Sequence, residues 1–270
     1  YSDQANGVPS GLVERDFRFN YFKNDGSGTF TLQDYVDFSN VPVMILHPYY
    51  QDGHWDMAAG DIDNDGDVDA VVVTGIKNSN GYIGTVKFSL LKYSSGSFNE
   101  TQNITFSVST TSPWLWGLVD LGDMNRDNYL DLIMVVQGYY APRNPLYPRI
   151  YVQNNTQMGS FVTSLNHVGT VVTSGSRLVC AYDVAHGDFL GTAYPDIIVS
   201  SNYDTDGNMI SGMLWVIGGL ANGGFTSQIF QVHQEIYHWG AREISVGKLD
   251  NTTGSDYALS YWYDSTLDDP

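Results

Sequence analysis

The residues best suited to chemistry are five aspartates at every second position of one short stretch. They are Asp61, Asp63, Asp65, Asp67 and Asp69. Carboxylates this close repel one another unless their oxygens converge on a cation, and Ca²⁺ accepts about six to eight oxygen ligands in flexible geometry. Gly66 supplies the turn that wraps the backbone around an ion. The pattern predicts a calcium loop over residues 60–69, with Asp69 closing the cage.

The residues after this loop distinguish it from an EF-hand. An EF-hand needs a bidentate Glu at loop position 12 and a helix on each side. Here position 12 is Val72, inside the apolar run 70–73, which predicts a buried strand. The sequence therefore favours a calcium loop on a β scaffold. The alternative, a solvated acidic turn without an ion, stays open.

The acidic motif recurs along the chain, each time before an apolar strand. Its four copies lie at 60–69, 122–131, 187–196 and 247–256, at a spacing of about 62 residues. A second element alternates with it, an aromatic-rich strand that runs into a tight glycine turn and a Phe. Its copies span 17–30, 86–98, 150–161 and 213–225 and carry hairpin signals. The chain thus begins with the second element and ends with the first.

These two elements predict an all-β fold in which each repeat is a small antiparallel sheet. Radial repetition of such four-stranded sheets is the β-propeller solution to exposed sheet edges. We predict a single β-propeller domain over residues 1–270, with four-stranded blades of about 62 residues. The segment 32–38 also allows a short helical turn. The stretch 202–207 resembles half a calcium loop, but turn chemistry is favoured there.

Composition limits the partners of the chain. The net charge of −18 argues against nucleic acid and anionic membranes. No apolar run is long enough for a transmembrane helix, so no membrane insertion is expected. The single cysteine, Cys180, can form no internal disulfide, and its apolar surroundings predict a buried strand residue. Because the sequence begins at Tyr1 without Met or a signal peptide, we expect a processed or excerpted chain.

The acidic loop before a buried strand and the later Gly-x-Phe hairpin resemble the FG-GAP/VCBS repeat. This repeat is the calcium-binding propeller unit of integrin α-chain heads and of many secreted surface proteins. The resemblance implies calcium ligands from the side chains of loop positions 1, 3, 5 and 9 and from the backbone carbonyl of position 7. The first copy would use Asp61, Asp63, Asp65 and Asp69 with the Asp67 carbonyl, and the second Asp123, Asn125, Asp127 and Asp131 with the Tyr129 carbonyl.

The four copies keep this pattern to different degrees. In the second copy Asn128 replaces the turn glycine, and Asn tolerates positive φ. The third copy has Leu190 and Thr192 at positions 3 and 5, and the fourth has Lys248 at position 1, where its ammonium would oppose a cation. We therefore expect two Ca²⁺ sites, in the first two copies.

Four repeats leave two arrangements open. Whole domains of this family commonly close about seven or eight blades. The terminal pieces of this chain can pair with each other in a four-unit ring. Alternatively, the chain is part of a longer protein, or its open edges pair with neighbouring subunits in a homo-oligomer or filament.

No catalytic constellation is evident, and the chain is not predicted to be an enzyme. The six histidines show no metal-ligand spacing, and no nucleophile elbow occurs. The predicted role is adhesion, surface structure or subunit assembly, through a protein or glycan ligand at the cell surface. One alternative is a carbohydrate-binding lectin, with Trp114 and Trp116 among the aromatics that could stack on sugars, although packing is the commoner fate of such residues. A polysaccharide-lyase-like enzyme is the second alternative.

Four sequons mark candidate glycosylation sites in surface positions. They are Asn99, Asn103, Asn154 and Asn251. Open calcium loops of this kind also suit extracellular calcium concentrations. We therefore predict an extracellular or cell-surface protein, with glycosylation at these sites.

Overall fold

The chain forms antiparallel sheets throughout the part that the computed structural model describes. This part comprises residues 11–45, 56–79, 83–108, 113–140, 144–164, 166–171, 179–192, 194–205, 208–220, 224–234, 241–247 and 255–261. Its regular structure consists of sixteen strands, without a helix in these ranges. None of them therefore holds a helix that is long and apolar enough to cross a membrane.

Three complete sheets have four strands each, joined in chain order as meanders. The first contains β3 (Met57–Gly60), β4 (Asp69–Lys77), β5 (Ile83–Ser94) and β6 (Ser97–Ser107). The second contains β7 (Pro113–Gly122), β8 (Asp131–Tyr140), β9 (Asn144–Gln153) and β10 (His167–Thr170). The third contains β11 (Val179–Gly187), β12 (Asp196–Thr205), β13 (Asn208–Gly219) and β14 (Phe225–Gln234).

Two further sheets have only two strands. β1 (Gly11–Asn24) pairs with β2 (Phe30–Ile45), and β15 (Ala241–Gly247) pairs with β16 (Asp256–Tyr261). The expectation of a short helical turn at 32–38 is wrong, because these residues lie in β2. Val36 and Phe38 pack on the first complete sheet, and Phe38 stacks on Phe17 at 4.6 Å between ring centroids. Burial of these aromatic and β-branched side chains against a sheet favours the strand.

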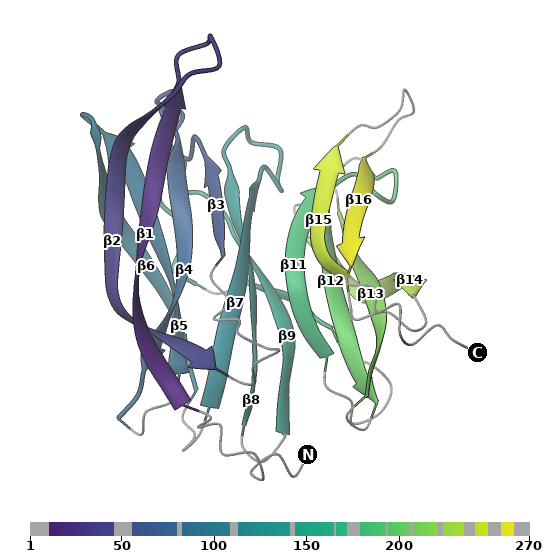
Figure 1. Ribbon diagram of the computed structural model, residues 1–270. Helices are drawn as coiled ribbons and strands as arrows, with labels where there is room; N and C mark the ends of the chain where they lie inside the picture. The colour runs from purple at the N-terminus through teal and green to yellow at the C-terminus, as the bar shows by residue number, and fades with distance from the viewer. Residues whose placement is uncertain are drawn as a thin grey trace.

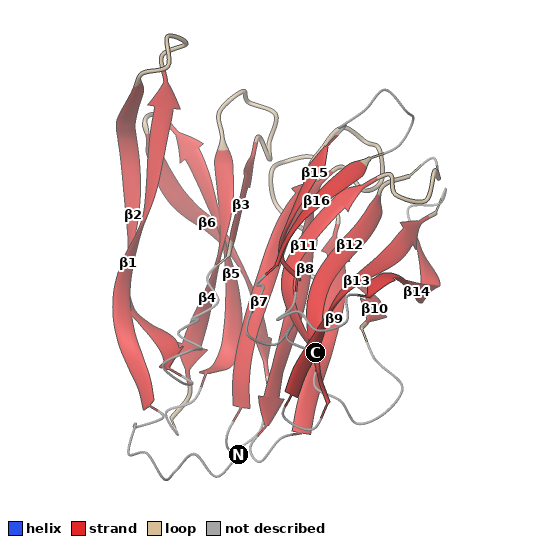
Figure 2. Cartoon of the chain, turned by 45° about the vertical axis from the view of Figure 1, so that its right-hand side comes forward, coloured by secondary structure: helices blue, strands red, loops and turns tan. Residues whose placement is uncertain are grey.

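Successive sheets along the chain pack face to face in one curved series (Figure 1). β1–β2 lies at the left in both views, and β15–β16 lies beside β11 and β12, apart from β1–β2 (Figures 1 and 2). A separate apolar cluster fills the space between each pair of successive sheets. The core is therefore a series of layers.

Central strands contribute side chains to two layers at once. In β4, Ala70 and Val72 face β1–β2, whereas Val71 and Val73 face the second sheet. All four are at most 3 % exposed. Because both faces of the strand are buried, its sequence is continuously apolar instead of alternating.

The predicted antiparallel repeats and hairpins are confirmed, and so is their offset along the chain. The two-stranded sheet at the start holds the hairpin element, and the one at the end follows the fourth acidic motif. β12 and β13 pair up to Thr205 and Asn208, as a hairpin turn requires, although 206–207 lie outside the described ranges. Cys180 lies in β11, as predicted for a strand residue.

Candidate metal centre

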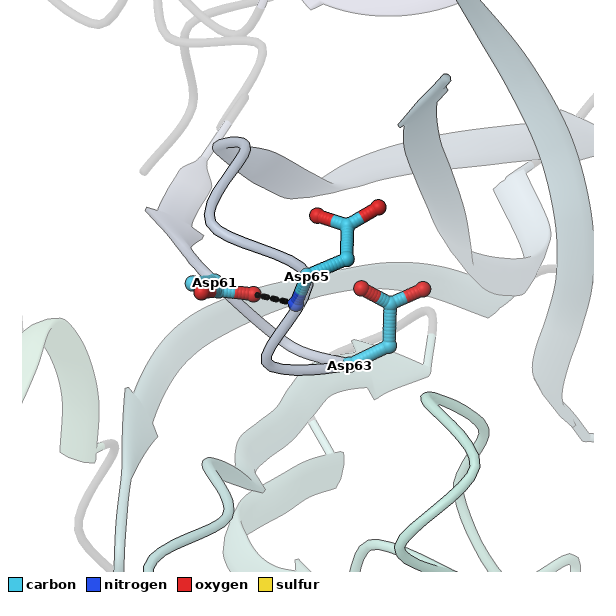
Figure 3. Close-up of side chains that lie close together, drawn as sticks. All are labelled: Asp61, Asp63 and Asp65. Atoms are coloured by element: carbon cyan, nitrogen blue, oxygen red, sulfur yellow. Dashed lines mark hydrogen bonds between the residues drawn. The ribbon is translucent and has the colours of Figure 1, made fainter.

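The loop between β3 and β4 brings three of the predicted ligands together. Asp61, Asp63 and Asp65 each offer a carboxylate oxygen within 4.8 Å of the others. Asp61 accepts hydrogen bonds from the N–H groups of Asp65 (3.1 Å) and Gly66 (2.9 Å). Figure 3 shows the carboxylates of Asp63 and Asp65 on the same side of the loop. The backbone therefore curls around the first aspartate and places the next two beside each other.

The second acidic loop, between β7 and β8, has the same wrap. Asp123 accepts from the N–H groups of Asp127 and Asn128, both at 2.9 Å. Asn128 has φ of 68°, which confirms that Asn serves at the turn position that Gly66 (φ 92°) occupies in the first loop. Asn125 accepts from the Asp127 N–H at 2.9 Å. At positions 1, 3, 5 and 9 this loop offers three carboxylates, one fewer than the first loop.

The position-9 aspartates have a structural role that sequence analysis missed. Asp69, Asp131 and Asp196 are at most 1 % exposed. One carboxylate oxygen of each aspartate accepts the N–H of the residue seven positions earlier in the chain. The other oxygen accepts an N–H at the end of the third strand of the same sheet or just beyond that strand. The donors are Ile62 and Tyr93, Met124 and Asn155, and Phe189 and Gly219. Each aspartate thus fastens its loop to its own sheet, and calcium ligation by Asp69 and Asp131 stays a prediction.

Burial disfavours the ionised form of the position-9 aspartates in both candidate loops. It raises the pKa of Asp69, and repulsion from Asp63 and Asp65 adds to this effect. Burial likewise raises the pKa of Asp131 to about 6, with repulsion from Asp127 and Asp123 adding to it. A cation bound by either loop would favour the carboxylates and offset this cost.

The donor set of the first loop suits a hard cation. Its side-chain donors are carboxylate oxygens, which Ca²⁺ prefers. One oxygen of Asp63, Oδ1, is buried without a hydrogen-bond partner in the described structure, so it is left to accept a cation. The other, Oδ2, lies 3.2 Å from the Lys92 ammonium, which also donates to the Met158 carbonyl at 3.1 Å. Lys92 therefore neutralises part of the negative charge of the first acidic loop.

Contacts between sheets also converge on the acidic loops. The Asn155 amide donates to the Ile62 carbonyl at 2.8 Å, from the second sheet to the first loop. Asn64 donates to the Asn128 carbonyl at 3.1 Å, which joins the two loops. Gly159 lies so close that an added Cβ would be 2.3 Å from Cβ of Asp63. The order of the first loop thus affects the packing of two sheets.

The third loop carries Leu190 and Thr192 at two of the ligand positions. Leu190 is 42 % exposed, and the Thr192 hydroxyl donates to the Tyr194 carbonyl at 2.8 Å. Position 1 of this loop, Asp188, accepts through its backbone carbonyl from the Ser255 N–H at 2.7 Å. In the fourth copy, Lys248 lies outside the described ranges.

A second polar region, which was not anticipated, lies along β3, β7, β11 and β15, the first strands of their sheets, called the inner strands below. A cavity of about 560 Å³ is bordered by β3, β7, β11 and β15 and by three aspartates, Asp56, Asp120 and Asp183. Asp56 accepts the Val119 N–H at 2.8 Å, and Asp183 accepts the Ile244 N–H at 2.6 Å, each from the next sheet. Both precede loop position 1 by five residues, and this shared offset is the signal that could have revealed them.

The third of these aspartates has a different partner. Asp120 Oδ2 lies 2.7 Å from Nδ1 of His186, on the neighbouring inner strand. The His186 ring packs so close to Gly122 that an added Cβ would meet it at 2.5 Å. These contacts join successive inner strands across the cavity. They give the acids of the cavity a role in holding the sheets together.

The carboxyl group of Asp56 makes stability depend on pH. Burial raises its pKa from 3.8 to about 7, and repulsion from Asp183 and Asp120 adds to this rise. Hydrogen bonds from the N–H groups of Val119 and Met57 lower the pKa, but by less than burial raises it. The folded chain therefore holds a proton that the unfolded chain releases above about pH 4. Stability contributed by this group should fall as pH rises from about 4 through about 7, by at most about 4 kcal/mol.

Urea unfolding between pH 4 and pH 8 measures this effect. Asp56→Asn removes the titrating group and should flatten the decline relative to the wild type. The matched control is Asp16→Asn at an exposed carboxyl of β1, which should keep the wild-type slope. Parallel pH profiles for Asp56→Asn and the wild type would contradict the prediction.

The candidate glycosylation sites that the structure describes are exposed. Asn99 and Asn103 lie on β6, the outer strand of the first sheet, and Asn154 follows β9. Asn251 lies outside the described ranges. Trp116 is half-buried on β7, while the side chain of Trp114 is outside the described part. Exposure makes glycan attachment at the three described asparagines sterically feasible.

Comparison with known proteins provides no relative, since no family model and no curated protein matches this chain.

Proposed function

We propose that the chain is a calcium-stabilised repeat protein of the FG-GAP/VCBS type, whose sheets act as propeller blades outside the cell. Its work is adhesion, surface structure or subunit assembly. The observation that carries the proposal is the convergence of Asp61, Asp63 and Asp65 in a loop whose backbone wrap recurs in the second sheet.

In this proposal calcium has a structural role. Asp61, Asp63 and Asp65 would hold the ion in the first copy, and Asp123, Asn125 and Asp127 in the second. Bound calcium would supply positive charge to carboxylates that otherwise repel one another. The loops would then be held in the conformation that Asn155 and Asn64 need to link the first two sheets.

The exposed aromatics favour assembly over sugar binding. Phe22, Phe30, Tyr35 and Tyr257 are the exposed Phe and Tyr side chains among residues of described exposure. All four lie on the two-stranded end sheets, in β1, β2 and β16. A lectin with one sugar site per blade would repeat an exposed aromatic on the complete sheets. In this proposal the exposed aromatic side chains of the two end sheets belong to a contact surface.

Calcium titration tests the metal sites. The wild type should bind two ions and gain thermal stability, because a ligand at about 100 times its Kd stabilises by about 2.7 kcal/mol. Asp65→Ala should lose one site and the part of the calcium-dependent rise in Tm that this site supplies. Isothermal titration gives the stoichiometry, and calorimetry in calcium and in chelator gives the two Tm values.

The matched control is Asp67→Ala, since position 7 is proposed to contribute only its backbone carbonyl. This variant should keep two sites. In chelator, Asp65→Ala should lose only the small contribution of its hydrogen bond from the Asp67 N–H. If Asp65→Ala lowers Tm equally in calcium and in chelator, the assignment of a metal site to this loop is contradicted.

A further inference from the structure

The two end sheets are complementary halves of one complete sheet. In each complete sheet, the first two strands flank the acidic motif and the last two flank or approach the glycine hairpin. β15 and β16 flank the fourth acidic motif and so correspond to the first half. β1 and β2 flank the first hairpin and correspond to the second half.

Hydrogen bonds in the hairpins support this equivalence. The Asp25 N–H donates to the Thr29 carbonyl at 3.0 Å, and Thr156 donates to Ser160 in the same way at 2.8 Å. The side chains of the preceding residues, Asn24 and Asn155, each accept an N–H two residues later. The β1–β2 turn is therefore built like the corresponding turn of the second sheet.

A register shift at the corresponding place supports the alignment of β1 with β5. The register of β1 with β2 shifts between Tyr21 and Phe22, and that of β5 with β6 shifts between Leu90 and Leu91. Phe22 thus corresponds to Leu91. Leu91 is fully buried between two sheets, whereas Phe22 is 53 % exposed. Phe22 has the position of a core residue without the neighbouring strand that would cover it.

The faces of the end sheets fit the same arrangement. Phe19 of β1 packs on the first complete sheet, and Ile244 of β15 packs on the third. In a complete sheet, one face meets the preceding sheet and the other meets the following one. Each end sheet therefore already makes the contact that its half of a completed sheet would make.

We propose that copies of this chain join end to end, with β16 of one copy pairing antiparallel with β1 of the next. β15, β16, β1 and β2 would then form a fourth four-stranded sheet shared by two copies. The partner that fits this edge is a second copy of the chain. The inference rests on the proposed role in assembly and makes it specific.

The complete sheets supply the expected register. In the first sheet, Asp69 accepts the Tyr93 N–H. The residue after this aspartate, Ala70, pairs with Leu91, which lies two residues before Tyr93. The third sheet repeats this with Ile197 and Ile217. In the shared sheet, Asn24 corresponds to the donor residue, and Tyr257 follows the position-9 aspartate, Asp256. Tyr257 would therefore lie opposite Phe22, two residues before Asn24.

The positions of the two ends favour a second copy over closure within one chain. β1–β2 and β15–β16 are the first and last sheets of the series, they do not pair with each other, and they lie apart in both views (Figures 1 and 2). Unpaired strand edges are templates for pairing with another chain. The contact is head to tail, so repeated pairing gives a ring of copies if the rotation closes and a filament if it does not.

Cysteine cross-linking tests the pairing at the level of residues. Phe22→Cys and Tyr257→Cys are made separately in a Cys180→Ser background, and the two proteins are mixed and oxidised. Both original side chains are exposed, so these variants should fold. Directly opposite residues in paired strands come within disulfide range. A mixed disulfide dimer on a non-reducing gel, confirmed by intact mass, is expected.

Two controls define the face and the partner. Lys23→Cys mixed with Tyr257→Cys should cross-link at least tenfold less, because adjacent residues point to opposite faces. Equal cross-linking there would overturn the register. A single chain with both Phe22→Cys and Tyr257→Cys should form a ladder of linked copies. A disulfide-closed monomer would overturn the second copy as partner.

Light scattering provides a measurement that does not depend on disulfide geometry. The wild type should exceed monomer mass at high micromolar concentration, and Phe22→Asp should be monomeric with unchanged Tm. A wild type that is monomeric at every concentration would overturn the pairing. Each experiment is run in calcium and in chelator with Tm recorded. If copies pair but Tm does not depend on calcium, the metal sites are contradicted and the pairing stands. If Tm depends on calcium but copies do not pair, the pairing is contradicted and the metal sites stand.

Discussion

Asp196→Ala is expected to lower the free energy of unfolding by about 3 to 5 kcal/mol, equally in calcium and in chelator. The carboxylate of Asp196 is fully buried and accepts three backbone N–H groups. Its donors are Phe189 and Leu190, both at 2.8 Å, and Gly219 at 2.9 Å. Alanine would leave the buried Gly219 N–H and the partly buried Phe189 and Leu190 N–H groups without this acceptor, and a buried donor costs about 1 to 3 kcal/mol when it stays unsatisfied.

Urea unfolding followed by circular dichroism measures the loss. Asp196→Asn should fall between the wild type and the alanine variant, because its amide keeps one acceptor but directs a donor at the N–H groups. Thr192→Ala, in the same loop, removes one hydroxyl donor and should cost about 1 kcal/mol. A loss below that of Thr192→Ala would show that the carboxylate does not fasten the loop.

The same substitution in the first copy separates the two roles of a position-9 aspartate. Asp69 accepts N–H groups in the same arrangement as Asp196, but it lies beside the proposed calcium ligands. If Asp69 also binds calcium, Asp69→Ala loses additional stability in calcium. If its role is only structural, the losses in calcium and chelator are equal.

Phe88→Ala is expected to cost about 3 to 5 kcal/mol through loss of apolar contacts and a new cavity. Phe88 is 1 % exposed on β5, between the first and second sheets. Its ring lies edge-on to Phe106, with 5.9 Å between centroids. The opposing strand carries Gly117, where an added Cβ would lie 2.8 Å from the ring. Because Gly117 has no side chain, it cannot fill the space that the Phe88 ring leaves when it is replaced by alanine.

Denaturant midpoints of Phe88→Ala and Phe22→Ala make a matched comparison. Phe22 lies on β1, which corresponds to β5, but its side chain is exposed on the first sheet of the series. Phe22→Ala should therefore change the stability of the monomer by less than about 0.5 kcal/mol. Similar losses for both variants would mean that the layer between the first and second sheets is not a tight core.

Sequence alone determined the local parts of this protein. The loops at 60–69 and 122–131, the apolar strands behind them and the glycine hairpins follow from neighbouring residues. Turn conformation is a local property, so positive φ at Asn128 could be predicted from the residue type. The offset of the repeats, which leaves half a sheet at each end, was also legible in the order of the motifs.

Tertiary structure decided what depends on contacts between distant residues. The donors to Asp69, Asp131 and Asp196 from the third-strand side lie 23 or 24 residues further along the chain, so spacing alone suggested only ligands. Burial against another sheet made the segment 32–38 a strand, although its local sequence also allowed a helical turn. The acidic cavity of the inner strands and the placement of the end sheets likewise depend on how whole sheets pack, because their energies come from surfaces that meet only after the strands have formed.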